Sequence, residues 1–399
     1  MTPGVMSYEM SQTSKMEVLE KMRERYARRG RVGRSKLIDE VREMCGYERK
    51  YCIKVLNGKL PIGGSGCRRG GPHPRYGETE RAVLKVIWLA AEQPCGKRLK
   101  SAVPLWMPYY EREHGLVESA VRGRLLEMSA STMDRLLAPC RASLGSRGRC
   151  GTRPGTLLRK HIPIRTEHWD VSGPGWLEAD TVAHCGESMA GDFCWSVTLS
   201  DVHTQWTETR ATWNKGQHEV RRRITEVEET LPFAILGFDT DNGGEFINWH
   251  LADYFLLRKQ AVAFTRSRAY RKNDNARVEQ KNWTHVRQLV GYGRLEDPAQ
   301  ADRLNDLYVK DWNPFRNFFC PAMKHLRTEV EGSRKKRIYD QPATPFERLK
   351  ASAGVDPDQI KRLEAFMATL NPFELKRRIE KKLRWVLNPP KRVGERAAA

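Results

Sequence analysis

Three acidic residues have the side chains and the contexts that phosphoryl transfer with divalent metal ions requires. Asp180 lies in a strand-like run over residues 176–183, and Asp241 follows an apolar run and precedes a tight Asn-Gly-Gly turn. Glu279 lies at the start of a helical stretch. Divalent ions of this kind take hard oxygen ligands that converge from several elements. These three carboxylates are therefore the candidate catalytic residues and metal ligands.

The three acids stand in sequence blocks that resemble those of one family. The blocks are Asp180-Thr181, then TDNGGEF from Thr240, then NDNARVE ending at Glu279. In this order and on these element types, they resemble the DDE transposases of the retroviral-integrase superfamily, in the group of bacterial insertion-sequence enzymes. Glu279 lies 38 positions after Asp241. This is slightly more than is usual in retroviral integrases, and the loop over residues 266–275 can absorb the difference.

The resemblance covers roughly residues 173–290 and implies a fold, a cofactor and a reaction. The fold would be ribonuclease-H-like, and the three acids would hold two Mg²⁺ ions, for which Mn²⁺ can substitute. The enzyme would cut at the ends of a mobile element and join the freed 3′-hydroxyl groups to target DNA. Two alternatives stay open: a domesticated, non-catalytic DNA-binding regulator, and a nuclease of the same fold that cuts without strand transfer.

Two neighbouring acids compete for the same roles. Glu178 is two positions before Asp180 and therefore on the same strand face, and Asp239 stands in the same relation to Asp241. Asp180 is preferred because Thr181 completes the family pattern beside it. Asp241 is preferred because the Asn-Gly-Gly turn lets it reach the end of the sheet, where sites form in such folds.

The charge of the chain predicts a polyanionic partner. Lys and Arg outnumber Asp and Glu by 70 to 49 across 399 residues, which gives a formal net charge of +21. Cations near phosphates release condensed counterions and so favour binding to nucleic acid. We expect double-stranded DNA as the partner, both element ends and target. Because two DNA ends must be joined, we also expect a homodimer or higher oligomer on DNA.

The sequence also predicts where the protein is found. No apolar run approaches the roughly 20 residues of a membrane span, and residues 1–15 lack the apolar core of a signal peptide. We therefore expect a cytoplasmic, nucleoid-associated bacterial protein that does not contact a membrane.

The length predicts several domains, and the first is helical. Residues 1–60 are expected to form a helix-turn-helix-like DNA-binding domain, with Ser35 as a helix cap and Gly46 at the turn. A generic helical hairpin is the alternative. Residues 61–77, rich in Gly, Pro and Arg, predict a flexible basic linker.

A second helix-turn-helix-like domain is expected over residues 78–145. Ser129 or Ser131 would cap a recognition helix, and Thr132 and Arg135 near its N-terminal end would face DNA. A plain packing helix is the alternative. Residues 146–172 predict a second basic linker, which could follow a phosphate backbone or act as a solvated spacer.

Further DNA contacts are expected in this linker and around the acids. Asn282 could position DNA or a metal-bound water, or be a surface amide. The cations would position a phosphate backbone without specifying its sequence. The full set of predicted contacts outside residues 78–145 is Arg147, Arg149, Arg266, Arg268, Lys272, Lys281 and Asn282.

The acids must be positioned by a catalytic domain over residues 173–295. Alternating patterns predict strands over residues 177–184, 193–201, 206–212, 234–239 and 261–265, with helices over residues 215–231 and 246–259. This order gives a mixed five-stranded α/β sheet with flanking helices. Residues 296–399 form a basic C-terminal region for DNA binding or assembly, whose amphipathic segment 373–386 could cover DNA, face a partner subunit or be a solvated face.

Overall fold

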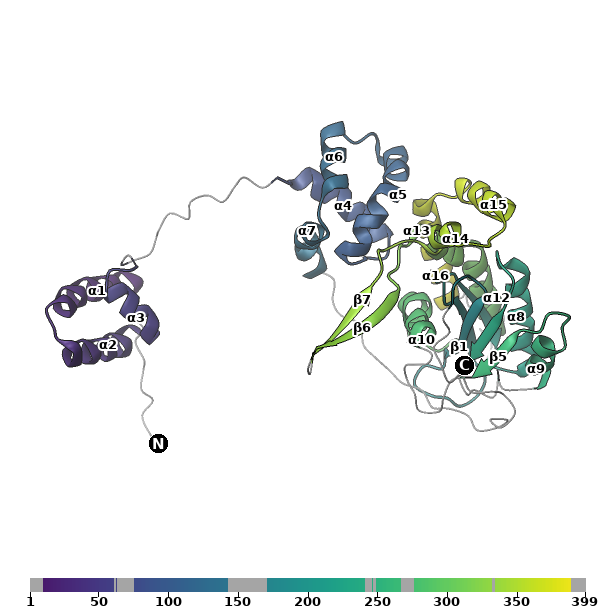
Figure 1. The fold of residues 1–399 in the computed structure, drawn as a ribbon, viewed down its shortest axis with the longest axis horizontal. Helices are drawn as coiled ribbons and strands as arrows, with labels where there is room; N and C mark the ends of the chain where they lie inside the picture. The colour runs from purple at the N-terminus through teal and green to yellow at the C-terminus, as the bar shows by residue number, and fades with distance from the viewer. Residues whose placement is uncertain are drawn as a thin grey trace, which may run out of the picture. The chain divides into compact units, whose positions relative to one another are not determined.

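The computed structural model describes residues 10–60, 62, 75–142, 171–240, 246, 249–266, 276–331 and 334–388. The chain divides into two compact units, Met1–Arg75 and Tyr76–Ala399, and each is described by itself (Figure 1). No helix within these described ranges is long and apolar enough to cross a membrane.

The described part of the N-terminal unit is all-α, as predicted. It consists of α1 (Gln12–Ala27), α2 (Arg31–Cys45) and α3 (Arg49–Leu56). Leu19, Leu37, Val41 and Val55 are almost completely buried and form its core. α2 ends at Gly46, whose φ of 71° lies in the left-handed region that glycine adopts without strain.

Ser35 does not cap a helix, and that prediction is wrong. α2 begins at Arg31, with Gly30 before it, so Ser35 lies inside the helix. Arg49 Nη2 donates a hydrogen bond of 2.9 Å to the Ser35 hydroxyl. The hydroxyl therefore links α2 to the start of α3 instead of satisfying a free backbone N–H.

The second unit begins with the helices α4 (Glu78–Ala90), α5 (Gly96–His114), α6 (Ser119–Glu127) and α7 (Ala130–Ala142). Ser129 Oγ accepts a hydrogen bond of 3.2 Å from the Thr132 N–H, so Ser129 is the serine that caps α7. The Gly96 N–H donates a hydrogen bond of 2.8 Å to Asp134 Oδ1, and this bond joins α5 to α7. A Cβ at Gly96 would lie 2.1 Å from the Ala130 carbonyl oxygen, so a larger residue would force these helices apart.

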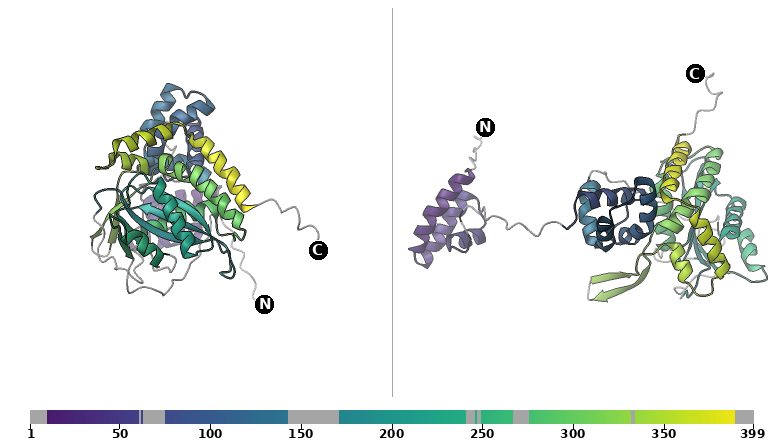
Figure 2. Two further views of the ribbon diagram at one scale, coloured as in Figure 1. Left: turned by 90° about the vertical axis from the view of Figure 1, so that its right-hand side faces the viewer. Right: turned by 90° about the horizontal axis from the view of Figure 1, so that it is seen from above.

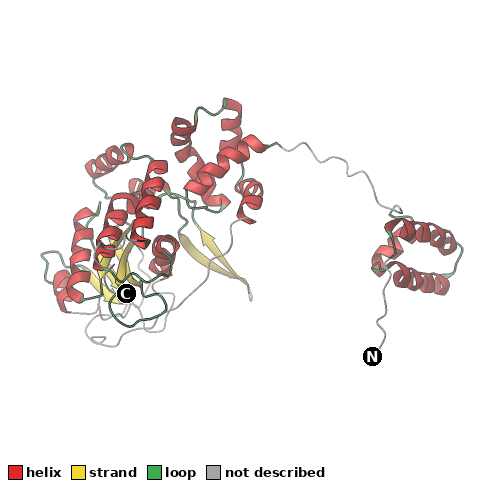
Figure 3. Cartoon of the chain, turned by 180° about the vertical axis from the view of Figure 1, so that it is seen from behind, coloured by secondary structure: helices red, strands yellow, loops and turns green. Residues whose placement is uncertain are grey.

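A mixed five-stranded sheet in the order β3-β2-β1-β4-β5 lies at the centre of the unit (Figure 3). β2 is antiparallel to β1 and β3, whereas β4 is parallel to β1 and β5. This is the ribonuclease-H-like layout that the sequence predicts. The elements are β1 (Trp176–Ala183), β2 (Cys194–Asp201), β3 (Thr207–Trp213), α8 (Gln217–Thr230), β4 (Gly237–Thr240), α9 (Trp249–Leu256) and β5 (Ala263–Arg266).

The two faces of the sheet differ in chemistry, because side chains alternate along each strand. On one face, apolar residues such as Leu177 and Val197 form a core with Val220 of α8 and Phe255 of α9. The other face carries polar side chains of β1 and β2. It is covered by α10 (Ala276–Lys281), by the π-helix η1 (Asn282–Arg287) that continues it, and by α12 (Pro298–Leu307).

Asparagines from α12 and from α13 (Asn313–Phe319) cover the outer edge of β3, and the π-helix η2 (Tyr308–Trp312) lies between these two helices in the sequence. Asn305 exchanges hydrogen bonds of 2.8 and 2.9 Å with the backbone of Ala211. Asn317 exchanges two bonds of 3.0 Å with the backbone of Thr207. These side chains occupy groups that an open strand edge would offer to another strand.

The remaining elements are α11 (Gln288–Val290), β6 (His325–Glu331), β7 (Arg334–Tyr339), α14 (Pro345–Ala351), α15 (Pro357–Ala368) and α16 (Pro372–Leu387). β6 and β7 form an antiparallel hairpin that projects from the rest of the unit (Figures 1 and 2). Helix α11 continues η1, so the helical stretch that the sequence predicts around Glu279 is confirmed.

The segments expected as separate domains over 78–145, 173–295 and 296–399 pack as one unit. Trp106 of α5 donates a 2.8 Å hydrogen bond to the Phe319 carbonyl oxygen of α13, and its ring contacts Phe373 of α16 edge-on at 5.1 Å. One hydrophobic core contains buried residues from all three segments. The helices α4 to α7, called the helical block below, are therefore not a freely tethered module.

Helix α16 packs inside the unit instead of presenting its amphipathic face to DNA or a partner. Leu375 and Ile379 are buried in the shared core. Its cations pair with acids of distant segments: Lys376 with Glu92, Arg377 with Glu113, and Arg378 with Asp311. The sequence could not distinguish this role, because the partners lie far away along the chain.

Candidate functional site

Asp180 lies on the polar face of the central strand β1 and is half-buried. Its Oδ1 accepts a hydrogen bond of 2.7 Å from the Thr181 N–H, and its Oδ2 accepts one of 2.7 Å from Asn282 Nδ2. These two donors fix the orientation of the carboxylate.

Asn282 joins β1 to the helix that carries Glu279. It is the first residue of η1, directly after α10, and is 8% exposed. Its amide nitrogen donates to Asp180, whereas its Oδ1 is buried without a hydrogen-bond partner among the described residues. A buried, unsatisfied oxygen beside an acid is costly unless a ligand satisfies it. The surface-amide alternative is therefore wrong.

Glu279 is exposed on α10, three positions before Asn282. Helix α10 packs against β1 and β2 and lies beside the sheet (Figure 1). The N–H of Val278, next to Glu279, donates 3.3 Å to Glu178 Oε2. The structure thus connects the helix of the predicted third acid with the strand of the first.

Asp241 lies outside the described residues. The parallel register between β1 and β4 places Ala179 opposite Thr240, and Asp241 is the next residue in the sequence. Asp180 and Glu279 are therefore the two predicted acids whose surroundings the structure describes.

The competing acids Glu178 and Asp239 occupy interior positions. Both are completely buried, and they are opposite one another in the β1–β4 register. Thr265 Oγ1 donates a 2.5 Å hydrogen bond to Asp239 Oδ1. Their burial suits a structural role better than contact with a large substrate, and this supports Asp180 over Glu178.

Two predicted DNA contacts, Lys281 and Arg266, are each 7% exposed. Burial lowers the pKa of Lys281 to about 7, assisted by the positive charges of Arg316, Arg348 and Arg98. Its Nζ donates to Gln205 Oε1 at 3.4 Å, which directs the ammonium group into the protein. These positions disagree with direct contacts to DNA, because such contacts require accessible cations.

Thr132 and Arg135 lie together near the N-terminus of α7, as predicted. Arg135 is exposed, and its Nη2 donates 3.1 Å to Thr132 Oγ1. The Thr132 hydroxyl also contacts the Ser129 hydroxyl at 2.9 Å. Arg147, Arg149, Arg268 and Lys272 lie outside the described residues.

The sequence analysis missed a second basic element, the β6–β7 hairpin. Residues 325–330 are exposed, as are Lys336 and Arg337 on β7. The sequences of the two strands contain two acids and five cations, which are Arg327, Arg334, Lys335, Lys336 and Arg337. The signal that could have revealed it is the Gly-Ser pair at residues 332 and 333 in the sequence, followed by four consecutive cations. A two-stranded ribbon of this kind fits the major groove of DNA.

Comparisons with known proteins give one substantial similarity. No family model matches the chain. A solved structure, the simian T-cell lymphotropic virus intasome in complex with PP2A regulatory subunit B56 gamma, contains a similar chain at 14% identity and a TM-score of 0.32, covering 62% of this chain and 75% of that one. The protein "Uncharacterized protein y4rM" of Sinorhizobium fredii (strain NBRC 101917 / NGR234) is 36% identical over 351 residues, which is 86% of this chain and 97% of that protein. With this identity over nearly the whole of both proteins, the chain belongs to the same family as y4rM of Sinorhizobium fredii.

Proposed function

We propose that this chain is a DNA transposase of the integrase type. It binds the ends of its mobile element, cleaves to expose 3′-hydroxyl groups and joins them to target DNA. The observation that carries the proposal is the hydrogen bond from Asn282 to Asp180. It fastens the helix of Glu279 to the central strand of a ribonuclease-H-like sheet, and this supports the proposal that acids far apart in the sequence form one site.

The donor set fits divalent cations. Asp180, Asp241 and Glu279 would hold two Mg²⁺ ions, or Mn²⁺ in their place, through the hard carboxylate oxygens that these ions prefer. The buried Oδ1 of Asn282 is a further hard oxygen without a partner among the described residues. When bound, the ions would supply activation of the attacking hydroxyl and stabilisation of the leaving oxygen.

The chain's own residues would hold the acids in place for this chemistry. The Thr181 N–H and the Asn282 amide donate to different oxygens of Asp180 and prevent its carboxylate from rotating. Packing of α10 on β1 and β2 fixes the backbone from which Glu279 extends. A phosphoryl-transfer reaction requires metal ligands with fixed positions, because a small displacement of the reacting groups lowers the rate by a large factor.

The substrate in this proposal is double-stranded DNA, both element ends and target. A net charge of +21 supports a polyanionic partner, and exposed cations lie on α7 and on the β6–β7 hairpin. Joining two ends to one target requires a homodimer or higher oligomer on DNA.

The test uses purified protein with labelled DNA from both flanks of its gene, with Mg²⁺, with Mn²⁺ or with EDTA. A transposase gives metal-dependent 3′-end cleavage and joined products. Cleavage without joined products would identify a nuclease of the same fold. Specific binding without any metal-dependent product would identify a DNA-binding regulator and contradict the proposal.

A further inference from the structure

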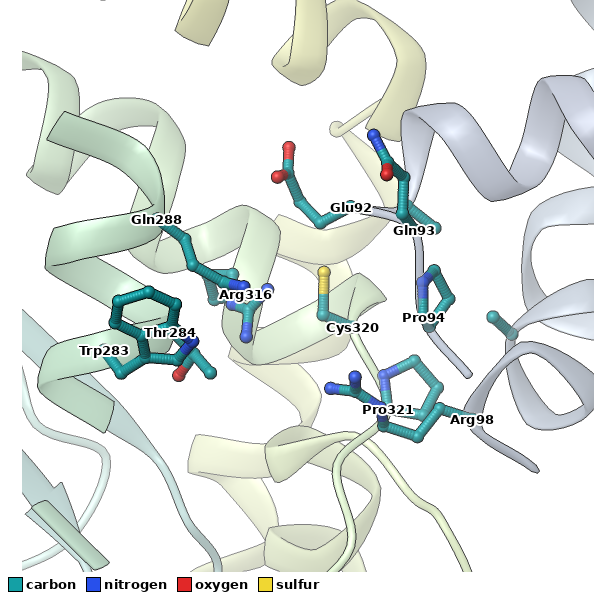
Figure 4. Close-up of a pocket in the computed structure, with 12 residues that line it drawn as sticks. Glu92, Gln93, Pro94, Arg98, Trp283, Thr284, Gln288, Arg316, Cys320 and Pro321 are labelled. Atoms are coloured by element: carbon teal, nitrogen blue, oxygen red, sulfur yellow. The ribbon is translucent and has the colours of Figure 1, made fainter. Parts of the chain in front are cut away.

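A cavity of about 190 Å³ opens where the helical block meets the helix of the third acid (Figure 4). One wall is the segment between α4 and α5, including Glu92 and Gln93. The opposite wall is η1, with Trp283 and Thr284, and α13 contributes Arg316. None of these residues contributes to the acidic site described above.

Two arginines give the cavity a positive charge. Arg98 of α5 and Arg316 of α13 both direct their guanidinium groups into it (Figure 4). Neither has an ion-pair partner among the described residues, whereas the acid in the wall, Glu92, pairs with Lys376. Burial raises the pKa of the Cys320 thiol in the same wall to about 11, and the positive charges of both arginines oppose that rise.

Arg316 is positioned in the cavity wall where its guanidinium could bind an anion. Its guanidinium lies over the Trp312 ring at 5.4 Å, and its Nε is buried without a hydrogen-bond partner among the described residues. A buried N–H of a charged group that lacks a partner costs free energy, which an anionic ligand can recover. Guanidinium groups match the oxygens of phosphate especially well.

Trp283 supplies an aromatic surface beside these cations. Its side chain is 37% exposed, and it stands four positions after Glu279 on the same continuous helix. Exposed aromatic rings next to cations are the usual means of holding unpaired nucleotides, by stacking on bases whatever their sequence. The same helix therefore carries both Glu279 and an aromatic wall of the cavity.

The volume of the cavity argues against a free metabolite. Typical small-molecule sites have about 300–1,000 Å³, and this cavity has about 190 Å³. A ligand that enters only in part, such as one nucleotide of a longer strand, fits this size better.

We propose that this cavity binds an unpaired DNA strand next to the cleavage site, with a phosphate between Arg98 and Arg316 and an adjoining base on Trp283. The inference rests on the proposed function for the identity of the strand. The cavity would be a site, additional to the proposed function, that separates a frayed or cut DNA end from the duplex.

The test measures DNA binding in EDTA, so that no cleavage is involved. Fluorescence anisotropy compares a labelled duplex that has a short unpaired overhang with its blunt counterpart. Arg98→Gln and Trp283→Ala should each weaken binding of the overhang duplex about 5- to 100-fold, as expected for one phosphate or one stacked base. Binding of the blunt duplex should change little.

Lys100→Gln is the matched control, because Lys100 is an exposed cation on the same helix as Arg98. It should behave like the wild type, and Trp283→Phe should retain most of the affinity for the overhang. Equal losses in Arg98→Gln and Lys100→Gln, or no preference of the wild type for the overhang, would overturn the cavity proposal alone. Wild-type binding without metal-dependent products in the cleavage assay would instead overturn the proposed function.

Discussion

Asn282 connects two elements whose acids are the predicted metal ligands. Its amide nitrogen bonds Asp180 on β1, and its own backbone follows α10, which carries Glu279. Residues that orient a metal ligand in this way affect metal binding without touching the substrate. Asn282 is thus a positioning residue in this account.

Replacing Asn282 by Ala should raise the Mg²⁺ concentration needed for half-maximal cleavage. We expect a loss of about 10- to 100-fold in activity at limiting metal, which is typical for such outer partners, with DNA affinity unchanged. The measurement is cleavage rate against Mg²⁺ concentration. Gln280→Ala is the control, since Gln280 is an exposed amide on the same helix. An unchanged metal dependence in Asn282→Ala would refute the positioning role.

At the scale of single residues, the sequence predicted the local context of the acids better than it predicted the burial and the neighbours of the cations. The context of Asp180 and Glu279 could be read from strand and helix patterns, because those patterns are local. The burial of Lys281 could not, because the groups around it, Gln205 and Arg316, come from distant segments. A cation beside a catalytic acid looks like a DNA contact until its neighbours are known.

At the level of elements, the strands of the central sheet follow their alternating patterns closely. The antiparallel meander and the two parallel strands have the predicted order, and their ends differ by a few residues. α9 begins at Trp249 and not at residue 246. Helix α16 shows the limit of such patterns: its amphipathic sequence was clear, but the core that its apolar side enters is formed by α5 and α13.

The β6–β7 hairpin should contribute to DNA affinity without sequence preference. Replacing Lys336 and Arg337 together by Gln removes two exposed cations, so the slope of log affinity against log salt should decrease by about 2 if each contacts one phosphate. Salt titrations of duplex binding measure this slope.

The matched control for the hairpin is Lys361→Gln with Arg362→Gln on α15, which also removes two adjacent exposed cations. Its salt slope should stay close to that of the wild type. If both double variants reduce the slope equally, the hairpin is not a specific DNA-contacting element and general surface charge accounts for binding.

For the whole molecule, the main structural result is that the helical block, the sheet and the C-terminal helices share one hydrophobic core. The sequence predicted the segments but not their union, because linkers rich in Gly, Pro and Arg do not reveal how their flanking segments pack. Arg135 on α7 and the acids on β1 and α10 therefore belong to one compact unit. A DNA end bound by α7 would thus stand in a defined relation to the predicted catalytic acids on β1 and α10.

The most direct test of the central claim is a joining assay with DNA ends that already carry a free 3′-hydroxyl. Wild-type protein with Mg²⁺ is compared with Asp180→Asn, Asp241→Asn and Glu279→Gln, each checked for DNA binding. The account predicts joined products from the wild type, and a loss of more than about 1,000-fold in every variant, because each removes a metal ligand. Wild-type joining by any one variant would remove that acid from the site, and joining by all three would contradict the account.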